Sequence, residues 1–211
     1  MQKYEHAFGK NDIRGIYGED ITEELFYNTG IGFVEWLKEK SGKKTADMWI
    51  TITRDARLHS PALEKALADG ITSTGANVIN LGLAPTPIGY YSEVVGVEGY
   101  DVIAAAIITA SHNPKEYNGL KMTFNKRTLT EQQIKEVRDI TFKNWLSHPE
   151  AIAEVSQEDS SHTLKMTGKV AEVNIIPNYI KDMENRFGKI GEGVKVVVDS
   201  ANATGGVVGP E

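Results

Sequence analysis

Two kinds of hydrophobic pattern alternate along this chain. Short runs of apolar, mostly β-branched residues predict buried strands, and segments with apolar residues every three or four positions predict helices with one buried face. The predicted strands are 48–53, 77–81, 102–108, 119–124 and 194–199. Five helices are predicted. The first ends at about Lys40, the second starts at Ser60, the third ends at Val95, the fourth starts after Thr130, and the fifth spans about 175–187. Such alternation is the signature of an α/β layered fold.

Three of these helices carry start signals. The segments Asp20-Ile21-Thr22-Glu23 and Thr130-Glu131-Gln132-Gln133 are typical of capping boxes. Ser60 before Pro61 predicts a serine N-cap with proline in the first turn, where its missing N–H costs nothing. In the helix that follows Thr130, one face carries Ile134, Val137, Thr141 and Trp145.

The pattern also predicts domain boundaries. Residues 1–150 form one domain, and residues 151–170, which are polar and lack periodicity, are a linker or irregular excursion. Residues 171–211 are expected to be the start of a second, similar domain, because a strand at 194–199 needs a crossover helix and partner strands.

Composition excludes several classes of function. The 211 residues are 40% hydrophobic and 25% charged, which suits a globular core, and the net charge of -6 argues against nucleic acid or an anionic membrane as a partner. No secretory leader or membrane-length apolar run is visible, so a cytoplasmic protein is expected. The absence of cysteine excludes disulfides and thiolate chemistry. His6, His59, His148 and His162 lack metal-ligand spacing and are interpreted as incidental.

The strongest candidate for chemistry follows the apolar run 102–108, which is too uniformly apolar to have a solvated face. That run ends at Thr109-Ala110-Ser111-His112-Asn113-Pro114, and Asn118-Gly119-Leu120-Lys121 follows shortly after. A buried strand that delivers a serine to a polar loop presents a reactive group at the edge of a sheet. Taken alone, Ser111 could equally be a turn serine, and the Asn118-Gly119 pair indicates a turn that places Lys121.

The serine block resembles the phosphoserine loop of the α-D-phosphohexomutases, the phosphomannomutase/phosphoglucomutase family. Further segments are similar to family elements: Asp12-Ile13-Arg14-Gly15, although Asn11 stands where tyrosine is usual; Arg54-Asp55-Ala56-Arg57-Leu58-His59-Ser60, with Thr53 at a usual glycine; Pro85-Thr86-Pro87; and Val198-Asp199-Ser200-Ala201-Asn202-Ala203. The resemblance covers the first domain and the opening of the second. It implies a three-layer α/β/α sandwich with a mixed sheet, of the phosphoglucomutase first-domain type.

The resemblance also implies roles for individual residues. Ser111 would be phosphorylated and would be the phosphoryl donor, and its phosphate would ligate Mg²⁺. Lys121 would be a general acid/base. Arg14 would reach the phosphoryl group, with Asp12 orienting it, and His112 would belong to the same catalytic shell.

Two further residues, Asn113 and Arg57, would contact the substrate. For Arg57 a scaffolding role, in which an ion pair with Asp55 supports the serine loop, is an equal alternative.

The implied activity is interconversion of hexose 1-phosphate and hexose 6-phosphate through a 1,6-bisphosphate intermediate, with a glucose or mannose 1,6-bisphosphate as activator. The family's Asp-Gly-Asp-x-Asp-Arg loop is absent, so the other Mg²⁺ ligands are expected in a third domain outside this sequence, and the isolated fragment is expected to be inactive.

Three alternatives stay open at this point. Phosphoglucosamine mutase is a sister activity, although Asp12-Ile13-Arg14 and Thr109-Ala110 argue against it. A non-catalytic module that binds phosphosugars is a second. A generic nucleotide-binding domain is the third and weakest, because no G-x-G-x-x-G follows the first strand. The choice between mannose and glucose and the oligomeric state are left open.

Overall fold

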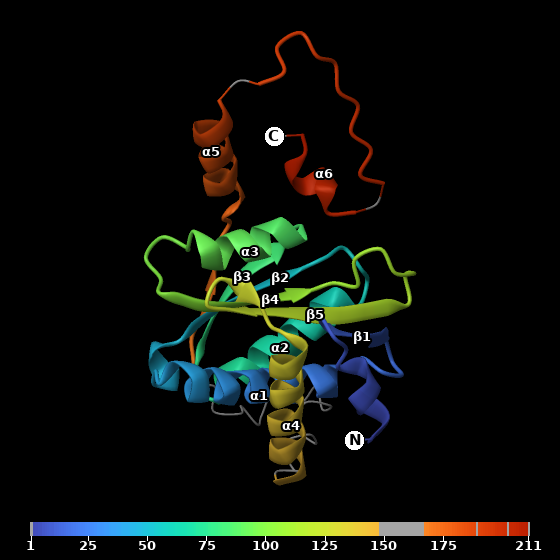
Figure 1. The fold of residues 1–211 in the computed structure, drawn as a ribbon, viewed down its shortest axis with the longest axis vertical. Helices are drawn as coiled ribbons and strands as arrows, with labels where there is room; N and C mark the ends of the chain where they lie inside the picture. Colours follow the sequence, from blue (N-terminus) through green and yellow to red (C-terminus); the bar gives the residue numbers. More distant parts are fainter. Residues whose placement is uncertain (1, 148–166, 189, 202, 211) are drawn as a thin grey trace, which may run out of the picture.

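The computed structural model describes residues 2–147, 167–188, 190–201 and 203–210 (Figure 1). Its centre is one mixed sheet of seven strands in the order β1-β5-β4-β2-β3-β7, with β6 beside β5. The strands are β1 (Ile13–Ile16), β2 (Trp49–Arg54), β3 (Asn77–Leu83), β4 (Val102–Ile108), β5 (Tyr117–Phe124), β6 (Arg127–Thr128) and β7 (Val170–Glu172). Strands β4, β2, β3 and β7 are parallel, while β5 runs antiparallel to both β4 and β1.

Helices cover both faces of this sheet. On one face lie α1 (Glu23–Ser41), α2 (Ser60–Ser73) and α4 (Glu131–Ser147), and on the other lies α3 (Thr86–Val94), as Figure 1 shows. Helices α5 (Ile176–Phe187) and α6 (Gly205–Val208) lie beyond α3, and two 3₁₀ helices span Gln2–Ala7 and Thr45–Asp47. The three-layer α/β/α sandwich with a mixed sheet is therefore confirmed.

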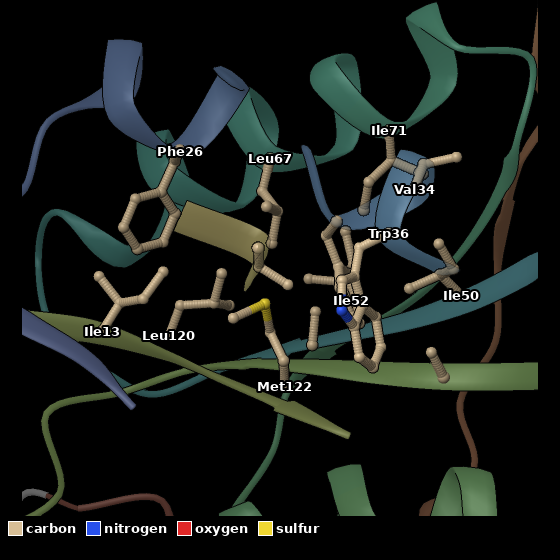
Figure 2. Close-up of a cluster of buried hydrophobic side chains, with 14 of the residues drawn as sticks. Ile13, Phe26, Val34, Trp36, Ile50, Ile52, Leu67, Ile71, Leu120 and Met122 are labelled. Atoms are coloured by element: carbon tan, nitrogen blue, oxygen red, sulfur yellow. The ribbon is translucent and has the colours of Figure 1, made fainter. Parts of the chain in front are cut away.

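The main core lies between the sheet and the helices α1, α2 and α4 (Figure 2). Helix α1 contributes Phe26, Val34 and Trp36, and all three side chains are fully buried. Strand β4 is buried on both faces from Ile103 to Ile108, as its uniform apolar pattern predicts. A smaller cluster fills the α3 side: Ile79, Leu81, Ala84, Ile88, Val97 and Ile175.

Two of the predicted helix starts need correction. The N-cap of α1 is Thr22 rather than Asp20: the Thr22 hydroxyl accepts the N–H of Leu25 at 3.1 Å. The N-cap of α2 is His59, and Ser60 is the first helical residue because its hydroxyl is used elsewhere, as a donor to Asp55. The box that opens α4 is confirmed, since Thr130 and Gln133 exchange hydrogen bonds.

The C-terminal part of the chain differs from the sequence prediction at one element. No strand forms over 194–199, where Val194, Val196, Val197 and Val198 are 66–95% exposed. A strand needs a neighbour to complete its hydrogen-bond ladder, and no described strand pairs with this run. Strand β7 pairs with β3 at the sheet edge, and most of the predicted linker, 148–166, lies outside the described residues. The domain boundaries stay predictions.

Candidate active site

Strand β4 ends at a polar loop, here called the serine loop (residues 109–117), which leads into the antiparallel strand β5. Ser111 lies in this loop and is exposed. Its φ of 53° is in the left-handed region, which L-residues rarely adopt. Two hydrogen bonds within the loop shape the turn: the Ser111 N–H donates to the Thr109 hydroxyl at 2.9 Å, and the Asn113 N–H donates to the Ala110 carbonyl at 3.0 Å.

Arg57 holds the serine loop from outside. Its Nε donates to Asp55 at 3.1 Å, in an ion pair whose two side chains are 13% and 15% exposed. Its two terminal nitrogens donate to four loop carbonyls, those of Pro114, Tyr117, Ser111 and Asn113. All five N–H donors of this guanidinium are thus engaged within the protein. This geometry favours the scaffolding role, and the substrate contact of Arg57 stays a prediction.

A second cationic group lies on the other side of the loop, where β1 pairs with β5. The Arg14 guanidinium donates to the Asn113 side chain at 2.7 Å and to the Ala110 carbonyl at 3.2 Å, so it contacts residues on both sides of Ser111. Asp12 accepts from Arg14 and from Lys121 through the same oxygen, at 2.5 Å each. Asp12 therefore joins the two predicted catalytic cations, and it orients Arg14 as the sequence predicts.

The pair Asn118-Gly119 does not form the predicted turn, because both residues belong to β5. Glycine is needed at 119 because a Cβ there would lie 2.1 Å from the Ile13 carbonyl oxygen of the paired strand. Asn118 is fully buried and supports the loop through its side chain rather than through a turn.

A cavity of about 980 Å³ opens beside the serine loop. Ser111, Asn113 and Arg57 line it, together with Tyr17, His59 and residues 203–204 near α6. Arg14, His112 and Lys121 are not among its lining residues, and His112 is exposed next to Ser111. The structure thus gathers Ser111, Asn113, Arg57, Arg14 and Lys121 around one loop.

Two tyrosines near this site are held in their neutral form. A hydrogen bond from the Tyr17 hydroxyl to Glu23, supported by burial, raises the pKa of Tyr17 to about 12. Burial, with a smaller effect of the Asp12 charge, raises the pKa of Tyr90 on α3. Near neutral pH both phenols are uncharged, and the Tyr17 hydroxyl donates to Glu23.

No group of three or more histidine, aspartate or glutamate side chains in the described part of the chain could hold a metal ion. Mg²⁺ needs several oxygen ligands, and around Ser111 the carboxylate of Asp55 is paired with Arg57 while that of Asp12 is paired with Arg14 and Lys121. These residues do not by themselves fit a Mg²⁺ site.

The sequence interpretation missed two residues of this site, Tyr17 and His59. The aromatic rings of these residues stack at 4.5 Å between centroids in the cavity wall. Neither carries a sequence signal, because Tyr17 lies outside the family-like segments and His59 has no metal-ligand spacing to another residue. Only the fold brings them together.

Comparisons with known proteins point in one direction. The family model described as "Phosphoglucomutase/phosphomannomutase, alpha/beta/alpha domain I" matches residues 5–147. A phosphomannomutase/phosphoglucomutase of Pseudomonas aeruginosa is 31% identical over 207 residues, which are 97% of this chain and 38% of that protein. A probable phosphoglucosamine mutase of Methanopyrus kandleri is 32% identical, covering 100% of this chain and 40% of that protein.

A crystal structure of a phosphoglucomutase/phosphomannomutase family protein from Burkholderia thailandensis superimposes with a TM-score of 0.64 and 25% identity, over 85% of this chain and 35% of that one. The chain therefore spans about 40% of the length of the curated relatives it matches. No helix in the described residues is long and apolar enough to cross a membrane.

Proposed function

This chain belongs to the phosphoglucomutase/phosphomannomutase family and corresponds to its α/β/α domain I, and from that premise we propose that it supplies the phosphoserine loop of a phosphohexomutase. The observation that supports the proposal best is the exposed Ser111, in a strained turn, flanked by the Arg14 contacts to Ala110 and Asn113. A guanidinium in that place suits the charge of a phosphoryl group.

The reaction proposed for Ser111 is a reversible phosphoryl transfer. The bond between phosphorus and the serine oxygen breaks, and a bond to a hydroxyl oxygen of a hexose monophosphate forms, giving the 1,6-bisphosphate. The attacking hydroxyl loses a proton, and the serine oxygen gains a proton. Lys121 is proposed to move this proton, as general acid/base. Transfer back from the other phosphate completes the isomerisation.

The remaining residues are proposed to position rather than to react. Asp12 would hold Lys121 and Arg14 at fixed places beside the loop, and Arg57 would fix the loop backbone. Asn113 would contact substrate through the amide that Arg14 orients, and His112, exposed beside Ser111, would belong to the same shell. Mg²⁺ is proposed for the whole enzyme only, since the described residues do not fit it alone, and no step here depends on it.

The sugar is proposed to be glucose or mannose phosphate rather than glucosamine phosphate. Overall identity does not separate the two activities, because relatives of both kinds are about equally similar to this chain. The support is the amino-acid sequence of two segments, Asp12-Ile13-Arg14 and Thr109-Ala110. Turnover of mannose 6-phosphate and glucose 6-phosphate against glucosamine 6-phosphate, in a protein that spans the full length of the relatives, distinguishes the two.

The donor role is tested by intact mass spectrometry of a protein that spans the full length of the relatives, after incubation with glucose 1,6-bisphosphate and Mg²⁺. One added phosphate is expected, mapped to Ser111, and absent in Ser111→Ala but retained in Ser147→Ala, a control at the end of α4. In a full-length protein Ser111→Ala should abolish isomerisation, and Lys121→Ala should lower turnover by about 10²–10⁴-fold. An unchanged rate in the serine variant would remove the donor role and leave the non-catalytic binding module.

A further inference from the structure

His59 lies in the family-like segment Arg54–Ser60, but the resemblance gives it no role in the site. It precedes α2 directly, lines the cavity together with Ser111, and lies between Arg57 and Ser60 in sequence. Both of its ring nitrogens are within hydrogen-bond distance of the protein. Nδ1 lies 2.7 Å from the Asn118 side-chain nitrogen, and Nε2 lies 3.1 Å from the Lys115 carbonyl oxygen.

The surrounding hydrogen bonds determine which nitrogen carries the proton. Asp55 can only accept, so the Ser60 hydroxyl donates to it at 2.7 Å and in turn accepts from the Asn118 amide nitrogen at 2.9 Å. The Asn118 oxygen is occupied by the Gly119 N–H at 2.8 Å, so Asn118 presents its NH₂ group to His59.

It follows that Nδ1 is the acceptor and that the proton is on Nε2. A backbone carbonyl can only accept, and Nε2–H donates to the Lys115 carbonyl. The two ends of this chain of bonds, the Asp55 carboxylate and the Lys115 carbonyl, therefore require the same tautomer. A proton on Nδ1 would oppose the Asn118 NH₂ group and would leave the Lys115 carbonyl without its donor.

The plane of the ring is fixed as well. The Tyr17 ring stacks on it with 14° between planes, and the Tyr17 hydroxyl is bound to Glu23. The Tyr17 backbone N–H donates to the Glu116 carbonyl at 2.8 Å. Tyr17 thus holds both the imidazole and the residue that follows Lys115.

Together with Arg57, these groups engage every carbonyl from 113 to 117 with a donor from outside the loop. This matters because Ser111 has an unfavourable backbone conformation, which persists only where surrounding contacts impose it.

We propose that His59, as the Nε2–H tautomer, is a positioning residue that restrains the serine loop and thereby fixes the Ser111 hydroxyl at the cavity. The restraint itself stands on the geometry alone, and its consequence for phosphoryl transfer rests on the proposed function. His59 contacts neither substrate nor phosphoryl group in this role, because both of its nitrogens are engaged by the protein.

The first test uses the unaltered chain and reads the ring directly. Two-dimensional ¹H–¹⁵N NMR should show the neutral imidazole of His59 as a single species, the Nε2–H tautomer. The exposed ring of His6 has Asp20 as its one hydrogen-bond partner among the described residues, and so lacks the second restraint. An Nδ1–H tautomer, or a His59 ring that exchanges between tautomers, overturns the proposal without any variant having to fold.

The second test uses His59→Phe, which keeps a ring for stacking on Tyr17 and removes both hydrogen bonds, with His6→Phe as the matched control. Hydrogen exchange at the amides of Ser111, Asn113 and Tyr117 should become about tenfold faster in His59→Phe and stay unchanged in the control. Amides in the middle of α1 should not change in either variant. Unchanged loop exchange overturns the proposal.

The third readout separates this proposal from the proposed function. In a protein that spans the full length of the relatives, phosphate uptake from glucose 1,6-bisphosphate should be slower in His59→Phe than without the substitution, and His59→Gln, which offers an NH₂ donor and a carbonyl acceptor, should recover part of the rate. If the unaltered full-length protein takes up no phosphate, the proposed function fails while the tautomer and exchange results still decide the restraint. If uptake occurs at the same rate in His59→Phe, the positioning role fails and the proposed function stands.

Discussion

Asp12 is the single acceptor shared by two partly buried cations, Arg14 and Lys121. Removal of the acceptor and removal of one donor are therefore unequal changes. Asp12→Ala leaves two neighbouring positive charges without their counter-ion, and we expect it to lower the free energy of unfolding by about 1–3 kcal/mol. Lys121→Met leaves Asp12 still paired with Arg14, and we expect a loss below about 1 kcal/mol. Urea unfolding of both variants and of the double variant measures the difference, and equal losses would contradict the shared-acceptor geometry.

Asp20 gives a prediction about pH. The backbone N–H of Ile16, bonded at 2.9 Å, and to a lesser degree His6, hold the pKa of this carboxyl below its ordinary value. The charged form is thus favoured in the folded state, so its contribution to stability is complete above about pH 4, the pKa of an unfolded aspartate, and is lost as the pH falls through the lowered folded-state pKa.

Asp20→Asn keeps an oxygen for the Ile16 N–H and removes the charge. We expect the variant to be less stable than the unaltered chain at pH 7, with a gap that shrinks as the pH is lowered from 4 toward 2. Urea midpoints across this range measure it. A gap that is the same at every pH would show that the charge contributes nothing.

Single residues of the site were predictable where a short segment carries the chemistry. Ser111, Arg14 and Lys121 stand in such segments, and the structure brings their segments together around one loop. The ion pair of Arg57 with Asp55 was predictable, but the bonds that Arg57, His59 and Tyr17 donate to backbone carbonyls of the serine loop were not. A carbonyl carries no sequence signal, and only the folded path of the chain shows which one a donor meets.

At the scale of elements, helices α1 and α2 approach unusually closely. A Cβ on Gly70 of α2 would lie 2.0 Å from the Tyr27 carbonyl oxygen of α1, so the two backbones are nearly in contact there. Backbone atoms cannot rotate away as a side chain can, and the helices would have to separate over the part of the core that contains Leu67 and Phe26.

Gly70→Ala should therefore be destabilising, although alanine is the better helix former by about 1 kcal/mol. Overpacking of a tight contact costs about 1–3 kcal/mol or more, and we expect a net loss of stability in urea or thermal unfolding. Ala62→Gly, at an exposed position of the same helix, measures the helix propensity alone. A Gly70→Ala variant that gains stability, as propensity alone predicts, would contradict the close approach.

Most elements followed from local signals. Strand β4 and the cap of α4 could be predicted because burial on both faces and an N-terminal box each leave a mark within a few residues. The run 194–199 shows the limit of this reasoning. Its valines favour extended backbone, but a strand exists only where a second strand completes the ladder, and this depends on segments far away in sequence.

At the scale of the whole molecule, the large core is built before residue 148, between the sheet and helices α1, α2 and α4. The later segments are attached by less apolar contact: β7 at the sheet edge, and α5 through Ile175 and the Tyr91–Tyr179 ring pair. The three-layer architecture was predictable because it follows from the alternation of elements. The sheet order was not, since β1 pairs with β5, and partners such as Ile13 and Leu120 lie far apart in the sequence.

The exposed valines of 194–198 make this part of the surface prone to self-association. Val197 is 95% exposed, and the backbone around it belongs to no strand. Unpaired backbone with β-branched side chains is a template for pairing with another chain. We therefore expect the particle size of the unaltered chain in light scattering or sedimentation to rise with concentration, and Val197→Lys to reduce this rise. Its melting temperature should hardly change, because an exposed substitution usually alters stability by no more than about 0.5 kcal/mol.

The matched control is Leu146→Lys, which removes a comparably exposed apolar side chain, 67% exposed near the end of α4. In a helix the backbone groups bond within the segment, so this leucine offers apolar surface but no ladder for a second chain. If pairing through extended backbone drives association, Val197→Lys lowers it and Leu146→Lys leaves it nearly unchanged. Equal effects of the two variants would instead mean that exposed apolar area alone is responsible, and the extended run 194–198 would then have no special part in self-association.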